Sequence, residues 1–327
     1  MQRAIDAWYR DMGGAWDLWL ATRDEWRRLT AKLVHAPSAD CIVPKTSAGQ
    51  GLRAVLNTFT TRPRVLTTNA EFDSLDFILR VYRDKGRIDL KVLDYDEFRP
   101  ERCDLLVIST VAFRSGAVLP NLRETVSKAR ALGACVLLDV YHHAGVLPLD
   151  LAALDADFAV GGSYKYLRGG PGACWLYVHP RHHALRTLDT GWFAKKDVFG
   201  YRRPNPPQYA PGGDSWLEST PAVVTPFQAL AGIELTLELG VERLRAYGLE
   251  QKRRLAALIA DAQGAGEEHG AFVHVIHPDA PRLAADLERA QVKVDARGAY
   301  LRICPDILTS AAELERAAAT LGPMLAR

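Results

Sequence analysis

The sequence has few cysteines, no long hydrophobic run and no excess of charge of one sign. Its five cysteines are odd in number and scattered, without a C-x-x-C pair, so they do not predict a disulfide framework and fit a reduced cytoplasm. No window approaches the ~20 apolar residues that a membrane helix needs. The 41 basic and 39 acidic residues nearly cancel, leaving a net charge of +2 with histidines neutral. We therefore expect a cytoplasmic protein with no membrane partner and no nucleic-acid partner.

Short apolar runs recur along the first two thirds of the chain, and helical patterns lie between several of them. Runs this apolar are typical of strands that are covered on both faces. Strands that alternate with helices predict a parallel sheet built from βαβ units. The runs that predict strands are residues 41–43, 64–68, 104–109, 134–139, 158–162 and 174–178.

The pattern changes after about Pro226. Two long helical stretches follow, over residues 227–247 and 249–263, and then two strand-like runs among further helices. This pattern predicts a smaller α+β domain. The predicted organisation is an N-terminal helical segment (1–34), a large domain (35–226) and a small C-terminal domain (227–327).

Two capping boxes and one irregular loop are expected as well. Asn121 with Glu124 and Ser310 with Glu313 each have the spacing of a capping box, so each pair predicts a helix start. Residues 201–213 are rich in proline and glycine and predict a long surface loop of the kind that serves as a lid or an interface element.

Chemically reactive residues follow several of the predicted strands. In open parallel sheets, ligands bind outside the carboxyl ends of the strands. Asp139 ends one predicted strand, Lys165 follows the next, and Phe72 follows another. The turn PKTSAGQG enters a helix at the end of the first strand, and the unpaired N–H groups there suit a phosphate. A lysine, a carboxylate, an aromatic ring and an anion nest together describe a pocket for pyridoxal 5'-phosphate.

Three motifs resemble one family of enzymes that use this cofactor. The runs SYKYLRGGPG, DVYHHAGVLPLDL and TGWF resemble the kynureninase branch of the fold-type I pyridoxal phosphate enzymes, close to the class V aminotransferases and cysteine desulfurases. The similarity extends from about Trp16 to the end. It implies an aspartate-aminotransferase-like α/β large domain, with a mostly parallel sheet between helices, and a smaller C-terminal α+β domain.

The resemblance also implies roles for individual residues around the cofactor. Lys165 would hold the cofactor, Asp139 would contact the pyridine nitrogen, and His142 would sit near the phenolic oxygen. Tyr164 would reach the phosphate and act as a proton donor. The other implied cofactor-binding residues are Phe72 on the ring, Ser47, Gly49 and Gln50 in the phosphate turn, Trp192 at the active-site entrance, and Ser219 and Thr220 on the phosphate of a neighbouring subunit.

The implied activity is hydrolysis of the Cβ–Cγ bond of L-kynurenine or 3-hydroxykynurenine, which gives an anthranilate and L-alanine. The resemblance also implies a small-molecule amino-acid substrate, a place in tryptophan catabolism and a homodimer with shared active sites. Arg302 would bind the substrate carboxylate, and an arginine in a buried strand needs an anion to compensate its charge. No metal is expected, because the adjacent His142 and His143 point in different directions and no further ligands with suitable spacing appear.

Four positions depart from the pattern of the family, and they keep other reactions open. Ala112, Ser215, His143 and Arg168 stand where the family usually has other residues. An aminotransferase, a β-lyase, a cysteine desulfurase and a non-catalytic homologue are therefore alternatives. The desulfurase ranks lower, because Cys304 lies in a predicted strand rather than in a loop.

Overall fold

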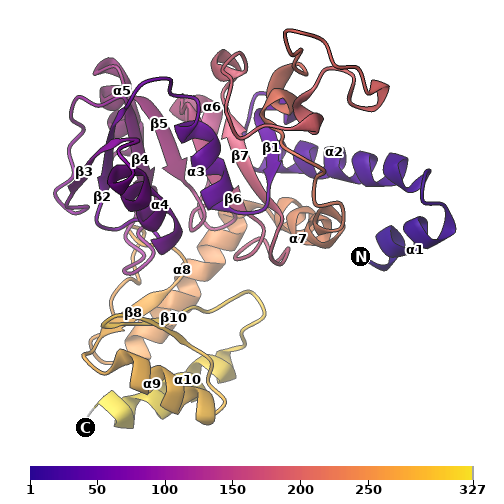
Figure 1. Ribbon diagram of the computed structural model, residues 1–327. Helices are drawn as coiled ribbons and strands as arrows, with labels where there is room; N and C mark the ends of the chain where they lie inside the picture. Colours follow the sequence, from indigo (N-terminus) through magenta and orange to yellow (C-terminus); the bar gives the residue numbers. More distant parts are fainter. Residues whose placement is uncertain (326–327) are drawn as a thin grey trace. The chain divides into compact units, whose positions relative to one another are not determined.

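A seven-stranded sheet forms the centre of the larger part of the molecule (Figure 1). The computed structural model describes residues 1–325. The strand order is β1-β7-β6-β5-β4-β2-β3, with parallel pairing from β6 through β3 and antiparallel pairing of β7 with both of its neighbours. The strands are β1 (Ile42–Lys45), β2 (Arg64–Thr68), β3 (Asp89–Leu93), β4 (Leu105–Ser109), β5 (Cys135–Asp139), β6 (Phe158–Gly162) and β7 (Cys174–Val178).

This topology places the ends of six strands at one edge of the sheet. Strands β2 to β6 run parallel, and β1 has the same direction because it is antiparallel to β7, which is itself antiparallel to β6. The mostly parallel sheet between helices confirms the predicted fold class. Strand β3 was not predicted, because its sequence DLKVL alternates charged and apolar residues on a half-exposed edge strand.

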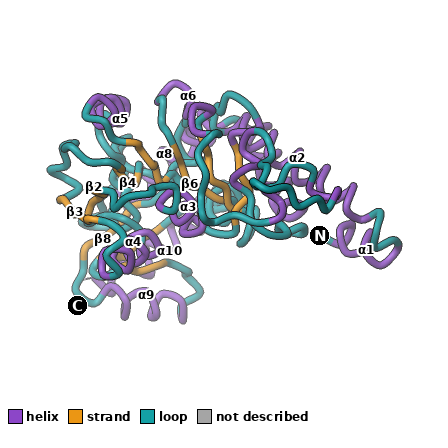
Figure 2. Tube along the Cα trace, turned by 45° about the horizontal axis from the view of Figure 1, so that its top comes forward, coloured by secondary structure: helices purple, strands orange, loops and turns teal. Residues whose placement is uncertain are grey.

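Helices connect these strands and pack on the sheet. α3 packs on β6 and β7, and its buried Leu52 and Val55 join a core with Val107, Leu137 and Val160. Near the N-terminus, α2 lies beside β1 (Figure 1), and α1 lies against α2 (Figure 2). The helices of this part are α1 (Gln2–Arg10), α2 (Ala15–Leu33), α3 (Ala48–Leu56), α4 (Asp73–Asp84), α5 (Leu122–Ala131), α6 (Leu151–Leu154) and α7 (Thr225–Leu239).

The chain divides into two compact units, one formed by Met1–Thr110 with Asn121–Glu238 and the other by Val111–Pro120 with Leu239–Arg327. The domain boundaries that we expect at residues 34 and 226 stay predictions. In the second unit a three-stranded antiparallel sheet, in the order β8-β10-β9, packs with helices around a separate apolar core. Its elements are α8 (Val241–Leu258), β8 (Val273–Ile276), α9 (Ala280–Arg289), β9 (Asp295–Arg297), β10 (Tyr300–Ile303) and α10 (Ala311–Leu325).

Two of the local predictions are wrong. The helical break expected near Gly248 lies at Gly240, whose φ of +81° ends α7, whereas Gly248 lies inside α8. Asn121 is the N-cap of α5, which confirms the predicted helix start, but it adopts a left-handed conformation with φ of 52° and its side chain makes no capping hydrogen bond, so the capping box is absent. The second capping box is confirmed, because Ser310 N donates to Glu313 Oε2 at 2.7 Å and Glu313 N donates back to Ser310 Oγ at 3.3 Å.

Residues 201–211 contain no helix or strand and are mostly exposed, which confirms the predicted surface loop except at its end, where residues 212 and 213 begin a short 3₁₀ helix, Gly212–Trp216. Its role as a lid or an interface element stays a prediction. Within residues 1–325, no helix combines the length and the apolar character needed to cross a bilayer.

Candidate functional site

Lys165 and Asp139 meet at the carboxyl edge of the sheet. Asp139 is the last residue of β5 and pairs in register with Val160 of the parallel strand β6, and Lys165 follows β6 closely. The Nζ atom of Lys165 lies 2.6 Å from Nε2 of His142. The structure therefore brings together the three residues on which the predicted cofactor site depends most.

Two aromatic rings flank the lysine. The Nζ atom lies 5.2 Å from the centre of the Phe72 ring and 5.4 Å from that of Tyr141. Both distances allow a cation–π interaction, which lowers the cost of holding an ammonium away from water. Phe72 directly precedes α4, so the helix start fixes its position. Tyr141 was not predicted, although it lies within the quoted run DVYHHAG.

Asp139 is a buried carboxylate with incomplete compensation. Asp139 is 6% exposed, and its Oδ1 atom accepts a hydrogen bond from the backbone N–H of Tyr141 at 2.9 Å. Burial raises the pKa of Asp139 to about 6, while the Tyr141 N–H and the charge of Lys165 act in the opposite direction. A buried carboxylate of this kind is well suited to accept a hydrogen bond from a protonated ring nitrogen.

His142 links Lys165 to a tyrosine that was not predicted. Its Nδ1 atom lies 3.1 Å from the hydroxyl of Tyr166, and the two rings meet edge to face. If the ammonium of Lys165 donates to Nε2, then Nδ1 carries the proton of the neutral imidazole and donates to Tyr166. The order Lys165, His142, Tyr166 thus forms a chain of hydrogen-bonding groups.

Glu71 is a second buried carboxylate at the same edge, and it was not predicted. Its Oε1 atom accepts from the backbone N–H of Ser109 and the hydroxyl of Thr68, both at 2.9 Å, and Oε2 accepts from the Ser109 hydroxyl at 2.7 Å. Burial raises the pKa of Glu71 to about 7, and the negative charge of Asp139 adds to this shift. Glu71 directly precedes Phe72, so these hydrogen bonds hold the backbone next to the Phe72 ring in place.

The predicted phosphate turn is formed at the start of α3. Ser47 is the N-cap, and its hydroxyl accepts from the Gln50 N–H at 3.1 Å. Within residues 1–325 the N–H groups of Ala48 and Gly49 have no hydrogen-bond acceptor, so they can bind an anion. A Cβ atom on Gly51 would lie 2.6 Å from Cγ1 of Val160, so this glycine lets the first turn of α3 lie close to β6.

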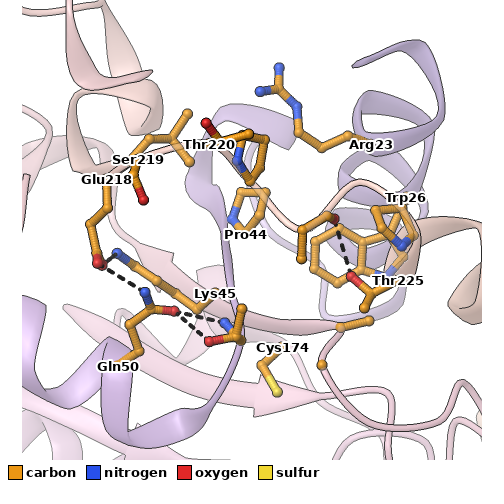
Figure 3. A pocket seen from close by; sticks show the side chains of 17 residues that line it. Arg23, Trp26, Pro44, Lys45, Gln50, Cys174, Glu218, Ser219, Thr220 and Thr225 are labelled. Atoms are coloured by element: carbon orange, nitrogen blue, oxygen red, sulfur yellow. Dashed lines mark hydrogen bonds and ion pairs between the residues drawn. The ribbon is translucent and has the colours of Figure 1, made fainter. Parts of the chain in front are cut away.

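A pocket lies beside this turn (Figure 3). Lys45 and Gln50 line it from β1 and α3, and Glu218, Ser219 and Thr220 line it from the segment that follows residues 212–216. The hydroxyl of Thr220 accepts from the indole N–H of Trp192 at 3.2 Å. The predicted contact of Ser219 and Thr220 with a neighbouring subunit stays a prediction.

The positions of Tyr164 and Arg302 leave their predicted roles untested. The Tyr164 residue is 58% exposed. The side chain of Arg302, in the second unit, is 11% exposed; it donates to Asp295 and to the carbonyl of Phe113, and it lies 4.9 Å from the ring centre of Phe272. The anion that a buried arginine requires is thus Asp295 on the neighbouring strand, and the argument from uncompensated charge does not by itself indicate a substrate carboxylate.

One group of possible metal ligands occurs among residues 1–325, at Cys135, Asp157 and His182, whose ligand atoms lie within 4.8 Å of one another. Asp157 already pairs with Arg181 at 2.8 Å and His182 at 2.6 Å. A metal ion would have to compete with the arginine, and burial raises the pKa of the Cys135 thiol to about 11. We therefore interpret this group as an ion-pair network.

Known proteins are similar to this chain over most of its length. The family model described as aminotransferase class-V matches residues 19–267. A kynureninase from Deinococcus radiodurans is 28% identical over 322 residues, covering 93% of this chain and 76% of the relative. A kynureninase from Bacillus anthracis is 26% identical over 310 residues, covering 85% of this chain and 72% of the relative.

Solved structures with low sequence identity share the fold. A mutant of C-DES, described with glycine covalently linked to its PLP cofactor, has a TM-score of 0.83 at 18% identity and covers 98% of this chain and 92% of its own. The apo cysteine desulfurase from Thermococcus onnurineus has a TM-score of 0.81 at 17% identity and covers 99% of this chain and 90% of its own. These neighbours support the fold-type I architecture.

Proposed function

Because this chain belongs to the aminotransferase class-V family, we propose that it is a pyridoxal phosphate hydrolase that cleaves the Cβ–Cγ bond of L-kynurenine or 3-hydroxykynurenine. The products are an anthranilate and L-alanine. The observation that carries this proposal is the similarity to kynureninases, which extends over 93% of the chain for one relative and 85% for another. The cluster of Lys165, His142 and Asp139 is consistent with it.

Pyridoxal 5'-phosphate is the cofactor, and the donor set at the carboxyl edge fits it. Lys165 would supply the amine that holds it, Asp139 would accept a hydrogen bond from its ring nitrogen, and Phe72 would supply an aromatic face. The open amides of Ala48 and Gly49 would bind its phosphate. When bound, the cofactor supplies an electron-withdrawing ring that stabilises negative charge at the α carbon of the substrate.

The residues of the chain then hold and move protons. Once the amine of the substrate has displaced it, Lys165 would be free to remove the proton from the α carbon as a general base, and His142, 2.6 Å from its amine, would orient that amine. Asp139, which the charge of Lys165 helps to keep ionised, would accept a hydrogen bond from the ring nitrogen and so keep a proton on it. Tyr164 serves as a proton donor in this proposal.

The proposal extends to the assembly and the substrate. We place Ser219 and Thr220 at the phosphate of a partner subunit in a cytoplasmic homodimer, and we assign the substrate carboxylate to Arg302, which would have to share its guanidinium with Asp295. Tryptophan catabolism is the corresponding pathway.

The test is to incubate the protein with pyridoxal phosphate and L-kynurenine and to follow anthranilate by fluorescence and alanine by amino-acid analysis. Equal amounts of the two products are expected, and none with the Lys165→Ala variant. A protein that binds the cofactor but forms neither product would contradict the hydrolase proposal. The same assay with 3-hydroxykynurenine compares the two substrates through kcat/KM.

A cysteine desulfurase is the second candidate, and the position of Cys304 favours it. The residue was predicted to lie inside a strand, but β10 ends at Ile303 and Cys304 is exposed. An exposed thiol can act as the sulfur acceptor that such an enzyme needs. Sulfide release from L-cysteine in the presence of a reductant, lost in the Cys304→Ala variant, would support this reaction over the hydrolase.

A further inference from the structure

Lys45 is a buried lysine beside the phosphate turn. It is the last residue of β1, and its side chain is 1% exposed. Its Nζ atom donates to Glu218 Oε1 at 2.7 Å and to the carbonyl of Trp216 at 3.0 Å. Burial lowers the pKa of the Lys45 ammonium, and the neighbouring Glu218 raises it. Removing an ammonium from water costs free energy, and this cost is offset only when its hydrogen-bonding partners are held in place.

Gln50 connects this ion pair to the phosphate turn. Its Nε2 atom donates to Glu218 Oε2 at 2.9 Å, and its Oε1 atom accepts from the backbone N–H of Thr46 at 2.7 Å (Figure 3). Both oxygens of Glu218 are therefore used, one by Lys45 and one by Gln50. The Gln50 side chain thus links the backbone of Thr46, at the start of the turn, to the carboxylate of Glu218.

The hydrogen bonds among Lys45, Glu218 and Gln50, which we call the clamp, leave the turn of residues 46–50 little conformational freedom. Ser47 already caps Gln50, and a Cβ atom on Gly49 would lie 2.7 Å from Cδ1 of Ile78, so the turn also packs closely on α4. The amides of Ala48 and Gly49 are then presented in one geometry. Because a preorganised site loses less conformational freedom on binding, its affinity for a phosphate is higher.

We propose that Lys45 and Glu218 are positioning residues for the cofactor phosphate, acting through Gln50 on the turn of residues 46–50 without contacting the phosphate themselves. This inference rests on the proposed use of pyridoxal phosphate. It does not depend on kynurenine as the substrate. It assigns a role to two residues for which the sequence motifs gave none.

The test compares pyridoxal phosphate with pyridoxal, which has the same ring and aldehyde but no phosphate. The apoprotein is titrated with each compound, and the absorbance of the lysine-bound chromophore gives the dissociation constant. In Glu218→Gln and in Lys45→Met we expect the Kd for pyridoxal phosphate to rise at least tenfold and the Kd for pyridoxal to change less than twofold. The double variant should lose no more than the more affected single variant, because both act through one clamp.

The matched control is Arg80→Met, which breaks an exposed ion pair with Asp76 on α4 at 2.7 Å in the same unit. It should leave both dissociation constants unchanged. If Glu218→Gln shifts the two compounds equally, or shifts neither, the positioning role is overturned. Glu218→Gln retains side-chain volume and removes only the charge, so it keeps the test valid if Lys45→Met does not fold. Failure of the hydrolase proposal would appear in the anthranilate assay and would leave these binding constants unaffected.

Discussion

Asp139 and Asp157 are buried aspartates at opposite edges of the same sheet, and their surroundings differ sharply. Asp139 ends β5, whereas Asp157 directly precedes β6. Asp157 accepts from Arg181, from His182 and from the backbone N–H of Val136 at 2.9 Å, and although burial alone would raise its pKa, these partners hold the pKa below its usual value. Asp139 has one hydrogen-bond donor within residues 1–325, and burial raises its pKa.

We interpret this difference as that between a structural carboxylate, Asp157, and the carboxylate that we propose for cofactor binding, Asp139. At the Asp157 edge the charge is compensated within the chain, so it stabilises the fold. At the Asp139 edge the compensation is incomplete, and the remaining interaction energy is available to a ligand that brings a proton donor. Four substitutions test this distinction.

The largest effect is expected from Asp139→Asn. The amide of asparagine cannot keep a proton on the ring nitrogen. We therefore expect kcat for anthranilate formation to fall about 10²–10³-fold, which is the usual size of the effect when a group that places a proton in catalysis is removed. The melting temperature of the apoprotein should not fall, because a poorly compensated charge is removed. A large loss of thermal stability with kcat retained would reverse the roles that we assign to the two aspartates.

Asp157→Asn should act on stability instead. Removing this charge leaves Arg181 and His182 without their carboxylate partner. Because Arg181 is 28% exposed and can be partly solvated, we expect a loss of about 2–3 kcal/mol in the free energy of unfolding, measured in urea. The kcat of the folded variant should match that of the wild type, and a tenfold fall in kcat would contradict a purely structural role.

Glu71→Gln should change how stability depends on pH. The folded pKa of Glu71, about 7, lies above its ordinary value of 4.5, so the folded state binds more protons between these pH values. Its contribution is therefore fully present below about pH 4.5 and is lost as the pH rises through 7. The variant, which imitates the protonated acid, should be more stable than wild type by about 1–3 kcal/mol at pH 8 and equal to it near pH 4.5.

Thermal melts of the two apoproteins at both pH values check this prediction. Asp157 has the opposite sign, because its lowered pKa makes its contribution present above about pH 3.8 and lost in stronger acid. The difference in stability between Asp157→Asn and the wild type should therefore become smaller as the pH falls below 3.8. A Glu71→Gln difference that is the same at pH 4.5 and pH 8 would show that Glu71 does not titrate in this range.

The smallest effect is expected at Arg168, in the loop that follows Lys165. Arg168 adopts φ of 54°, a left-handed conformation that asparagine accepts more readily than arginine. Arg168→Asn should raise the free energy of unfolding by about 0.5–1 kcal/mol. Arg168→Ala serves as the control, since it removes the same side chain and keeps the strain; an equal gain in both variants would assign the effect to the side chain instead.

The sequence predicted those parts of the structure that depend on neighbours along the chain. Six strands of the large sheet were found because each is a continuous apolar run, and Lys165, Asp139 and Phe72 were placed at one edge because parallel strands end together. The partnership of Lys45 with Glu218 was not predicted, because these residues lie 173 positions apart and no local pattern relates them. Asp295 was missed for a similar reason, since only the register of β9 with β10 brings it to Arg302.

The assignment of residues 111–120 to the second unit has a consequence for dissecting the protein. Val118 N donates to Glu268 O at 2.8 Å and Gly270 N donates to Gly116 O at 2.7 Å, so this excursion of the chain supplies backbone partners to residues far downstream. A C-terminal fragment beginning at Leu239 would leave these partners behind, together with the carbonyl that receives Arg302. The second unit is therefore not an independently expressible module: a single proteolytic cut near residue 238 would leave a nicked molecule rather than two separable pieces.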